Sequence, residues 1–212
     1  MKKSNRKVPR VLEFRNHEAF IRDLVKKIPA EANKLSREAK KRHPDSERTR
    51  WTKAVKSVVH AVAPKLEKET VDFYGTRSEQ EKKYHEWLLD AVLYVESRGI
   101  LVAVESEFGR NVQGVVYDFW KLLSVKAALK ILILDSGKPR TRYAKKLFEE
   151  ITKYARGFEQ HLPKEIYYLL DFHHNRQDVY RYVIGDRCPQ GRARKFNFAH
   201  VPNLSSQKEP QV

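Results

Sequence analysis

The sequence contains little cysteine and glycine and has no long apolar run. Its single cysteine, Cys188, excludes a framework of disulfide bonds and a cysteine-based zinc site. Its 8 glycines form neither a Walker A loop nor a dinucleotide-binding fingerprint. Because no apolar stretch reaches the length of a bilayer and none follows the basic start, we expect neither a membrane span nor a secretory signal, and we predict a cytoplasmic protein.

Positive charge is in excess and is unevenly distributed. The formal net charge is +16 over 212 residues, a length that predicts one domain. Residues 1–70 hold 20 basic and 9 acidic side chains, residues 71–120 hold 5 and 9, and residues 121–212 hold 18 and 9. A basic chain attracts polyanions, nucleic acid first among them. An acidic centre would repel phosphate from a simple DNA coat, whereas an enzyme that holds divalent cations against phosphate needs one.

The N-terminal third of the chain is predicted to be helical. We expect a disordered basic arm over residues 1–10 and a helical region over 11–70. An amphipathic helix over 17–28 is expected to stop at Pro29, and a polar helix follows over 30–42. The next helix is expected to begin at a cap, Asp45 or Ser46, and to carry an apolar stripe of Trp51, Val55, Val58, Val59 and Val62.

Beyond residue 87 the pattern changes to that of strands, with a capping box at residues 78–81 just before it. Two apolar segments, 88–95 and 100–108, flank the turn-forming residues 96–99 and predict a β-hairpin. The elements expected after the hairpin are a helix over 118–130, a short buried strand over 131–134, a helix over 142–159, and strands over 166–172 and 179–184. This order predicts an α/β fold in which helices cover a mixed sheet.

The acidic centre coincides with the hairpin. Asp90 and Glu105 are carboxylates within apolar strand sequence, where burial without a partner costs several kcal/mol. We therefore expect a cation or a hydrogen-bond donor beside them. Glu105 and Glu107 are two residues apart, so their side chains point to the same face of the strand.

Strand register decides whether Asp90 joins them. A two-residue loop at Ser97 and Arg98 places Asp90 opposite Glu105, with their Cβ atoms roughly 5 Å apart. That spacing suits a shared Mg²⁺, which binds one or two carboxylates and keeps water and substrate phosphate as further ligands. Ser-Arg is a poor primed turn, however, and a three-residue loop that uses Gly99 puts Asp90 on the other face. In that case a shared site requires a β-bulge along the hairpin.

This pattern resembles the PD-(D/E)XK superfamily of nucleases. That family carries an Asp and, on the next strand, a (D/E)-x-K motif. Asp90 matches the first position and Glu105 the second, while Glu107 stands where the family has lysine. Some restriction enzymes of the superfamily carry Glu-x-Glu, and other members have the lysine on the following helix, where Lys121 lies. Many members also have a helical Glu before the hairpin, which Glu86 matches.

The resemblance covers residues 78–134 and implies a restriction-endonuclease-like fold, a mixed β-sheet flanked by helices. The nuclease-like core would span residues 71–186, after the helical region and before a basic C-terminal tail over 187–212.

The activity implied by the resemblance is metal-dependent cleavage of phosphodiester bonds. Asp90, Glu105 and Glu107 would bind Mg²⁺ or Mn²⁺, which acidifies a bound water and stabilises charge at the phosphate. Glu107 is also a candidate general base. Lys121 would position the water or stabilise the transition state, and Asp118 is a further candidate for the site.

These residues also have ordinary structural interpretations. Asp90 fits an exposed position on an edge strand, and the Glu-x-Glu pair fits a solvated strand face. Asp118 fits the opening of its helix, where negative charge is favourable. The remaining two candidates, Glu86 and Lys121, fit exposed helix positions.

The C-terminal tail offers a second kind of contact with nucleic acid. Basic side chains near Phe196 and Phe198 can hold a phosphate backbone and stack bases, although a solvated basic tail fits equally well. The basic residues concerned are Arg187, Arg192, Arg194 and Lys195. The His-His-Asn sequence at 173–175 is interpreted as a hairpin loop.

Three functions are therefore compared. The first is a Mg²⁺-dependent endonuclease that acts on DNA, with RNA as a further substrate class and a homodimer as the assembly common among restriction-type members. The alternative is a non-catalytic nucleic-acid-binding protein on the same fold. The third is a basic adaptor for an acidic protein, which leaves the acidic hairpin without a purpose.

Overall fold

The computed structural model describes residues 17–39, 46–63, 72–74, 89–95, 99–109, 111–137, 142–162, 164–173, 176–184 and 198–202. The helices within these ranges are α1 (His17–Ala39), α2 (Glu47–Val62), α3 (Val112–Ser124) and α4 (Arg142–Gly157). The strands are β1 (Asp72–Tyr74), β2 (Ala91–Val95), β3 (Gly99–Glu107), β4 (Leu129–Leu134), β5 (Ile166–His173), β6 (Arg176–Val183) and β7 (Ala199–His200).

The strands form one mixed sheet in which their spatial order equals their chain order. Strands β3, β4 and β5 run parallel, and the pairs on either side of them are antiparallel. The parallel steps require crossover connections, which are provided by α3 between β3 and β4 and by α4 between β4 and β5. This confirms the expected α/β class with helices flanking a mixed sheet.

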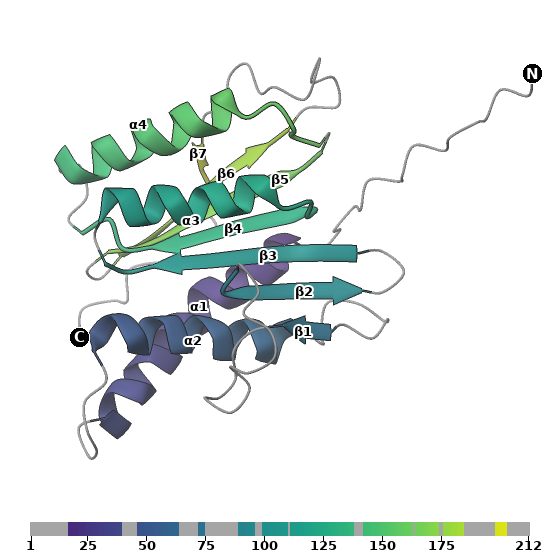
Figure 1. Cartoon of the computed structure of the whole chain (residues 1–212). Helices are drawn as coiled ribbons and strands as arrows, with labels where there is room; N and C mark the ends of the chain where they lie inside the picture. Colours follow the sequence, from purple (N-terminus) through teal and green to yellow (C-terminus); the bar gives the residue numbers. More distant parts are fainter. Residues whose placement is uncertain are drawn as a thin grey trace, which may run out of the picture.

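The helices cover the two faces of the sheet in pairs (Figure 1). Helices α1 and α2 pack on one face, over a core that includes Val104 and Ile131. Helices α3 and α4 pack on the other, over Ala103 and Leu132. Because side chains alternate along a strand, one residue step moves a side chain from one core to the other. The sheet separates the two helix pairs, so residues from both pairs can meet only at the ends of the strands.

Helix α1 runs through Pro29, so the prediction that the helix stops there is wrong. Proline removes a backbone hydrogen bond and costs about 3 kcal/mol inside a helix. The apolar face continues on both sides of it, with Ile28 and Ala32 buried. Packing of this continuous face against α2 and the sheet outweighs the local cost of the proline.

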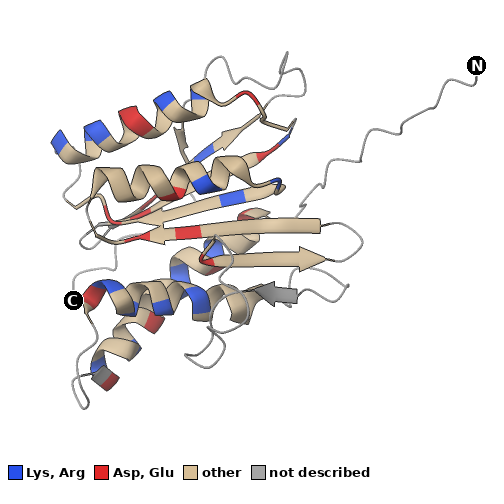
Figure 2. Cartoon of the chain, viewed as in Figure 1, with Lys and Arg blue, Asp and Glu red and all other residues tan. Residues whose placement is uncertain are grey.

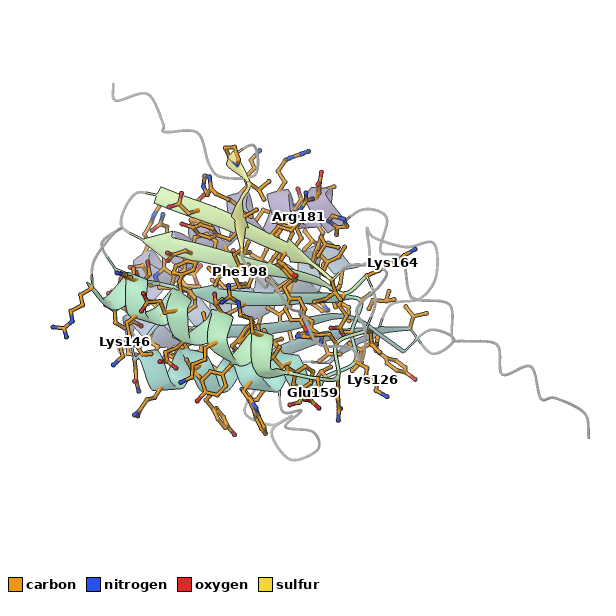
Figure 3. The ribbon with its side chains drawn as sticks, turned by 90° about the horizontal axis from the view of Figure 1, so that it is seen from above. Lys126, Lys146, Glu159, Lys164, Arg181 and Phe198 are labelled. Atoms are coloured by element: carbon orange, nitrogen blue, oxygen red, sulfur yellow. The ribbon has the colours of Figure 1, made fainter. Side chains whose placement is uncertain are left out.

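Ion pairs and hydrogen bonds also tie α1 to the sheet. Arg181 of β6 lies on the side of the sheet that faces α1 (Figure 3), and its Nη1 is 2.6 Å from Glu18 Oε1. His17 Nδ1 lies 3.0 Å from the hydroxyl of Tyr168. Long-range contacts of this kind hold the N-terminal helix against the same core as the strands.

Helix α3 begins six residues earlier than the sequence predicts. The side chain of Asn111 caps it by accepting a hydrogen bond from the backbone N–H of Gln113 at 3.1 Å. Asp118 therefore lies inside the helix and does not open it. The helix ends at Ser124, so Lys130 belongs to β4 and not to the helix predicted over 118–130.

Lys130 is part of a buried polar cluster at the end of α3, where its Nζ also donates a hydrogen bond to the carbonyl of Leu123 at 3.4 Å. Its Nζ lies 3.0 Å from Glu165 Oε1 and donates a hydrogen bond to the hydroxyl of Tyr167 at 3.0 Å. Burial lowers the pKa of Lys130 although the Glu165 carboxylate opposes this effect. The Lys130–Glu165 ion pair therefore links the beginnings of β4 and β5, at the end of the sheet that is remote from Glu107.

The remaining expectations have mixed outcomes. Ser46 caps α2 by accepting a hydrogen bond from the Thr49 N–H. Of the two predicted caps, Asp45 and Ser46, the structure therefore confirms Ser46. Strands β5 and β6 confirm the last two predicted strands, while β1 and β7 were not expected. The basic arm, the capping box at 78–81 and Cys188 lie outside the described residues. Within the described ranges, no helix combines the length and apolarity that crossing a membrane requires.

Candidate functional site

The hairpin of β2 and β3 contains the bulge that a shared acidic site requires. Near the turn Val95 pairs with Gly99, and the register then shifts between Leu93 and Tyr94. Beyond the shift Ala91 pairs with Val104. One further step in this register places Asp90 opposite Glu105. A bulge therefore lies along the hairpin as a shared site requires, although the turn closes at Val95 and Gly99, a pair that neither predicted loop would give.

Glu105 lies on the face of the sheet covered by α3. It pairs in register with Leu132, which belongs to the core beneath α3 and α4. Its exposed fraction is only 2%. Lys121 of α3 places its Nζ 2.6 Å from Glu105 Oε1. The solvated strand face considered for Glu105 is therefore wrong, because the carboxylate is buried against a lysine.

The environment of Glu105 disfavours its negative charge. Burial, together with the nearby charge of Asp90, raises the pKa of Glu105 to about 8, and Lys121 only partly opposes this. A carboxyl group with this pKa is largely protonated at neutral pH unless further positive charge arrives. A buried acid that is held in this state close to a second carboxylate is typical of a functional site.

Lys121 bridges two acids. Its Nζ lies 2.8 Å from Asp118 Oδ1 in addition to its contact with Glu105. Burial alone would lower the pKa of Lys121, but the two carboxylates raise it overall. Burial likewise raises the pKa of Asp118 against the opposing effect of Lys121. The lysine is therefore held in its charged form at the base of the acidic cluster, and the interpretation of Lys121 as a surface residue is wrong.

Asp90 is fixed by the strand opposite and by α2. Its Oδ2 accepts hydrogen bonds from the backbone N–H and the hydroxyl of Ser106, at 2.9 and 2.7 Å. Its Oδ1 lies 3.2 Å from Lys56 Nζ. These contacts set the orientation of the carboxylate and contradict the interpretation of Asp90 as an exposed edge residue.

Glu107 is engaged separately from Asp90 and Glu105. Its Oε2 accepts a hydrogen bond from Arg48 at 2.6 Å, and its Oε1 accepts one from the backbone N–H of Gly109. Gly114 of α3 also leaves room for it, since a Cβ there would lie 3.2 Å from Oε2. Glu107 therefore connects β3 to α2, and its charge, like that of Asp90, also acts on Asp118 of α3.

Two cations of α2 were missed by the sequence analysis. Figure 2 shows the acidic positions of β3 between basic positions on α2 and α3. Arg48 and Lys56 are eight residues apart, which is two helical turns, and reach Glu107 and Asp90 respectively. Their spacing on one helix was visible in the sequence, but nothing local indicated which acids they would meet.

The residues present fit a divalent cation in their chemistry. Asp90 and Glu105 supply the hard oxygen ligands that Mg²⁺ prefers. Glu105 Oε1 lies 2.6 Å from Lys121 Nζ but accepts no hydrogen bond of ordinary geometry. No preformed group of three or more metal-ligating side chains occurs among the described residues. The two carboxylates alone satisfy the protein share of a Mg²⁺ site, whose other ligands are water and substrate phosphate.

Several candidates cannot be placed. Glu86 and the tail residues Arg187, Arg192, Arg194 and Lys195 lie outside the described residues. Of the two tail phenylalanines only Phe198 is described, and it packs against the core beneath α3 and α4. In the His-His-Asn sequence, His173 ends β5 and pairs with Arg176, and the other two residues are not described.

Comparisons of the chain with known protein families, with curated proteins and with solved structures find no significant match.

Proposed function

We propose that this protein is a divalent-metal-dependent endonuclease of the PD-(D/E)XK type that cleaves phosphodiester bonds in DNA. The observation that carries the proposal is the contact of Lys121 Nζ with Glu105 at 2.6 Å, next to Asp90. Glu107 occupies the strand position where the motif has a lysine, and Lys121 of the following helix would take the place of that lysine. A buried Glu-Lys pair beside a second acid is a costly arrangement that packing alone does not require.

The residues of the acidic cluster would have different roles in cleavage. Asp90 and Glu105 would hold Mg²⁺, which supplies an acidified water and positive charge for the scissile phosphate. Ser106 and Lys56 orient the carboxylate of Asp90. Lys121, whose ammonium group carries three N–H donors and already contacts Asp118 and Glu105, would also donate to a phosphate oxygen in this partly buried site, where a charged donor stabilises developing negative charge strongly. Without a bound cation, protonation of Glu105 leaves the charge of Lys121 balanced by Asp118 alone.

The alternative is a nucleic-acid-binding protein without catalysis. The observation that favours it is the internal neutralisation of the cluster, since Asp90 has Lys56, Glu105 has Lys121 and Glu107 has Arg48. A site whose acids are all paired with lysine or arginine is stable without a metal. In that case the basic flanks alone would bind phosphates, with a steep dependence on salt.

Cleavage of supercoiled plasmid DNA distinguishes the two functions. We expect nicking that requires Mg²⁺ or Mn²⁺ and that falls at least about 10²-fold in Asp90→Asn and in Glu105→Gln. Glu149→Gln is the matched control, because Glu149 is an exposed acid of α4 that makes a long ion pair of 3.9 Å with the exposed Lys145. Undiminished cleavage by either site variant would refute the site. Tight, salt-sensitive binding without cleavage in any divalent metal would favour the alternative.

A further inference from the structure

Helix α3 carries two large aromatic side chains that pack against neither core. Tyr117 is 58% exposed and Trp120 is 53% exposed, whereas Phe119 between them is buried. Positions three apart are neighbours on a helix surface, so the two residues project from adjacent positions on the exposed side of α3. The helix is anchored by Phe119 and its apolar neighbours, and the exposed rings are not needed for that anchoring.

The aromatic pair adjoins the acidic site. Lys121 Nζ lies 5.5 Å from the centroid of the Tyr117 ring and 2.6 Å from Glu105 Oε1. The same ammonium group therefore contacts the ring on one side and the proposed phosphate-cleaving site on the other. A ligand that places a phosphate at Lys121 would bring whatever is attached to that phosphate next to Tyr117.

We propose that Tyr117 and Trp120 form a stacking platform for unpaired nucleobases, so that the preferred substrate contains a single-stranded or locally opened segment. This inference rests on the proposed nuclease function and specifies its substrate class. Aromatic faces stack with any base and confer little sequence preference. Bases in an intact duplex are stacked on one another and are not available to such a platform.

The charge around the rings favours nucleic acid over another apolar surface. Lys121 lies beside the Tyr117 ring while it is paired with Asp118 and Glu105, and Arg48 of α2 is 60% exposed while it is paired with Glu107. The exposed Lys126 follows the end of α3 (Figure 3). These cations would attract the phosphates of a nucleic acid, and the two rings would stack with its unpaired bases. A second copy of this basic chain would instead bring like charges together.

Binding of fluorescein-labelled oligonucleotides tests the platform. The probes are a 20-nucleotide oligo(dT) and a 20-base-pair duplex, in Ca²⁺ to suppress cleavage. We expect Tyr117→Ala and Trp120→Ala to weaken binding of oligo(dT) at least about ten-fold, while the duplex loses less than about three-fold. Tyr117→Phe and Trp120→Phe should retain binding. Alanine favours the helix, so these exposed changes keep the fold.

Tyr154→Ala is the matched control. Tyr154 is 41% exposed on α4 and lies next to Lys153, whose Nζ is 5.9 Å from its ring, but it belongs to another helix than the residues that contact Glu105. The Tyr154→Ala variant should bind both probes with the affinity of the wild type. Equal losses on the two probes, or unchanged oligo(dT) binding, would overturn the platform. Conversion of a wild-type dimer to a monomer by Trp120→Ala would assign the rings to a subunit interface and would also overturn it.

Failure of the platform and failure of the nuclease are distinguishable. If the plasmid is cleaved and Glu105→Gln abolishes the cleavage, the nuclease stands even when the alanine variants bind oligo(dT) normally. If the wild-type protein binds neither probe, both proposals fall.

Discussion

Glu105 combines burial, a neighbouring carboxylate and a close lysine, and these features make its protonation state depend on folding. Its pKa is raised from 4.5 to about 8 in the folded protein. Between these two values the folded state holds a proton that the unfolded state has lost. The free energy of unfolding therefore falls as pH rises through this window, in the absence of a divalent cation.

The variant Glu105→Gln removes this dependence. Relative to the wild type in EDTA, we expect it to be near neutral at pH 5 and more stable by on the order of 3 kcal/mol at pH 9, since its amide never becomes charged. Urea unfolding at the two pH values measures the difference. Glu149→Gln, on the exposed surface of α4, should show no such change. A difference for Glu105→Gln that does not vary with pH would contradict the burial of a titrating carboxyl group.

Lys121 has a close counterpart elsewhere in the fold. Lys153 also pairs with an acid three residues earlier, Glu150, and also lies over an aromatic ring, but it is exposed and remote from the acidic hairpin. We expect Lys121→Gln to lower single-turnover cleavage at least about 10²-fold, because it removes a charged donor from the phosphate. Lys153→Gln should cleave within about two-fold of the wild type. Equal rates for the two variants would remove Lys121 from the mechanism.

At the scale of elements, the site depends on how α2 meets the end of β3. Arg48 and the Gly109 backbone together hold Glu107. The absence of a side chain at Gly109 matters here, because a Cβ would lie 2.6 Å from Glu107 Oε1 and 3.0 Å from Arg48 Nη1. A larger residue must displace the carboxylate and its cation.

We expect Gly109→Ala to reduce the free energy of unfolding by about 1–3 kcal/mol through this crowding. Gly157→Ala is the control, since its added Cβ meets no atom within 4 Å. It should leave stability unchanged or slightly higher because alanine restricts the unfolded chain. Denaturant midpoints of the two variants provide the comparison. A Gly109→Ala protein as stable as Gly157→Ala would show that Glu107 has another orientation.

The local elements of the site could be predicted because their signals are local. A continuous apolar run over residues 100–104 marks β3, and two acids at the end of such a strand indicate a special environment. Lys121 follows on the next helix, within reach of the same face. The start of α3 was missed because its first turn, with Gly114 and two adjacent valines, lacks a strong helical period. Its cap, Asn111, satisfies the free N–H groups in that turn.

Contacts between distant segments could not be predicted. Arg48 and Glu107 are 59 residues apart, and no local pattern pairs them. Pro29 was misjudged for a related reason, because the packing of α1 on α2 and the sheet outweighs a local propensity. Both errors arise where the tertiary arrangement, and not the neighbouring sequence, determines the outcome.

At the scale of the whole molecule, the acidic segment of the sequence and its basic flanks come together in space. The acidic interruption of a basic chain becomes a cluster between the two helix layers, with lysine and arginine of α2 and α3 around it (Figure 2). In this arrangement basic groups would attract the polyanion while the paired carboxylates would concentrate a divalent cation at one point of it. The central claim is therefore that Asp90 and Glu105 hold that cation jointly.

Calorimetric titration with Mn²⁺ tests this claim most directly, because it depends on neither substrate nor turnover. We predict a saturable site in the wild type whose affinity falls at least about ten-fold in Asp90→Asn and in Glu105→Gln, since each removes a ligand. Glu149→Gln should bind like the wild type. Wild-type affinity in both site variants, or no saturable binding in the wild-type protein, would contradict the assignment.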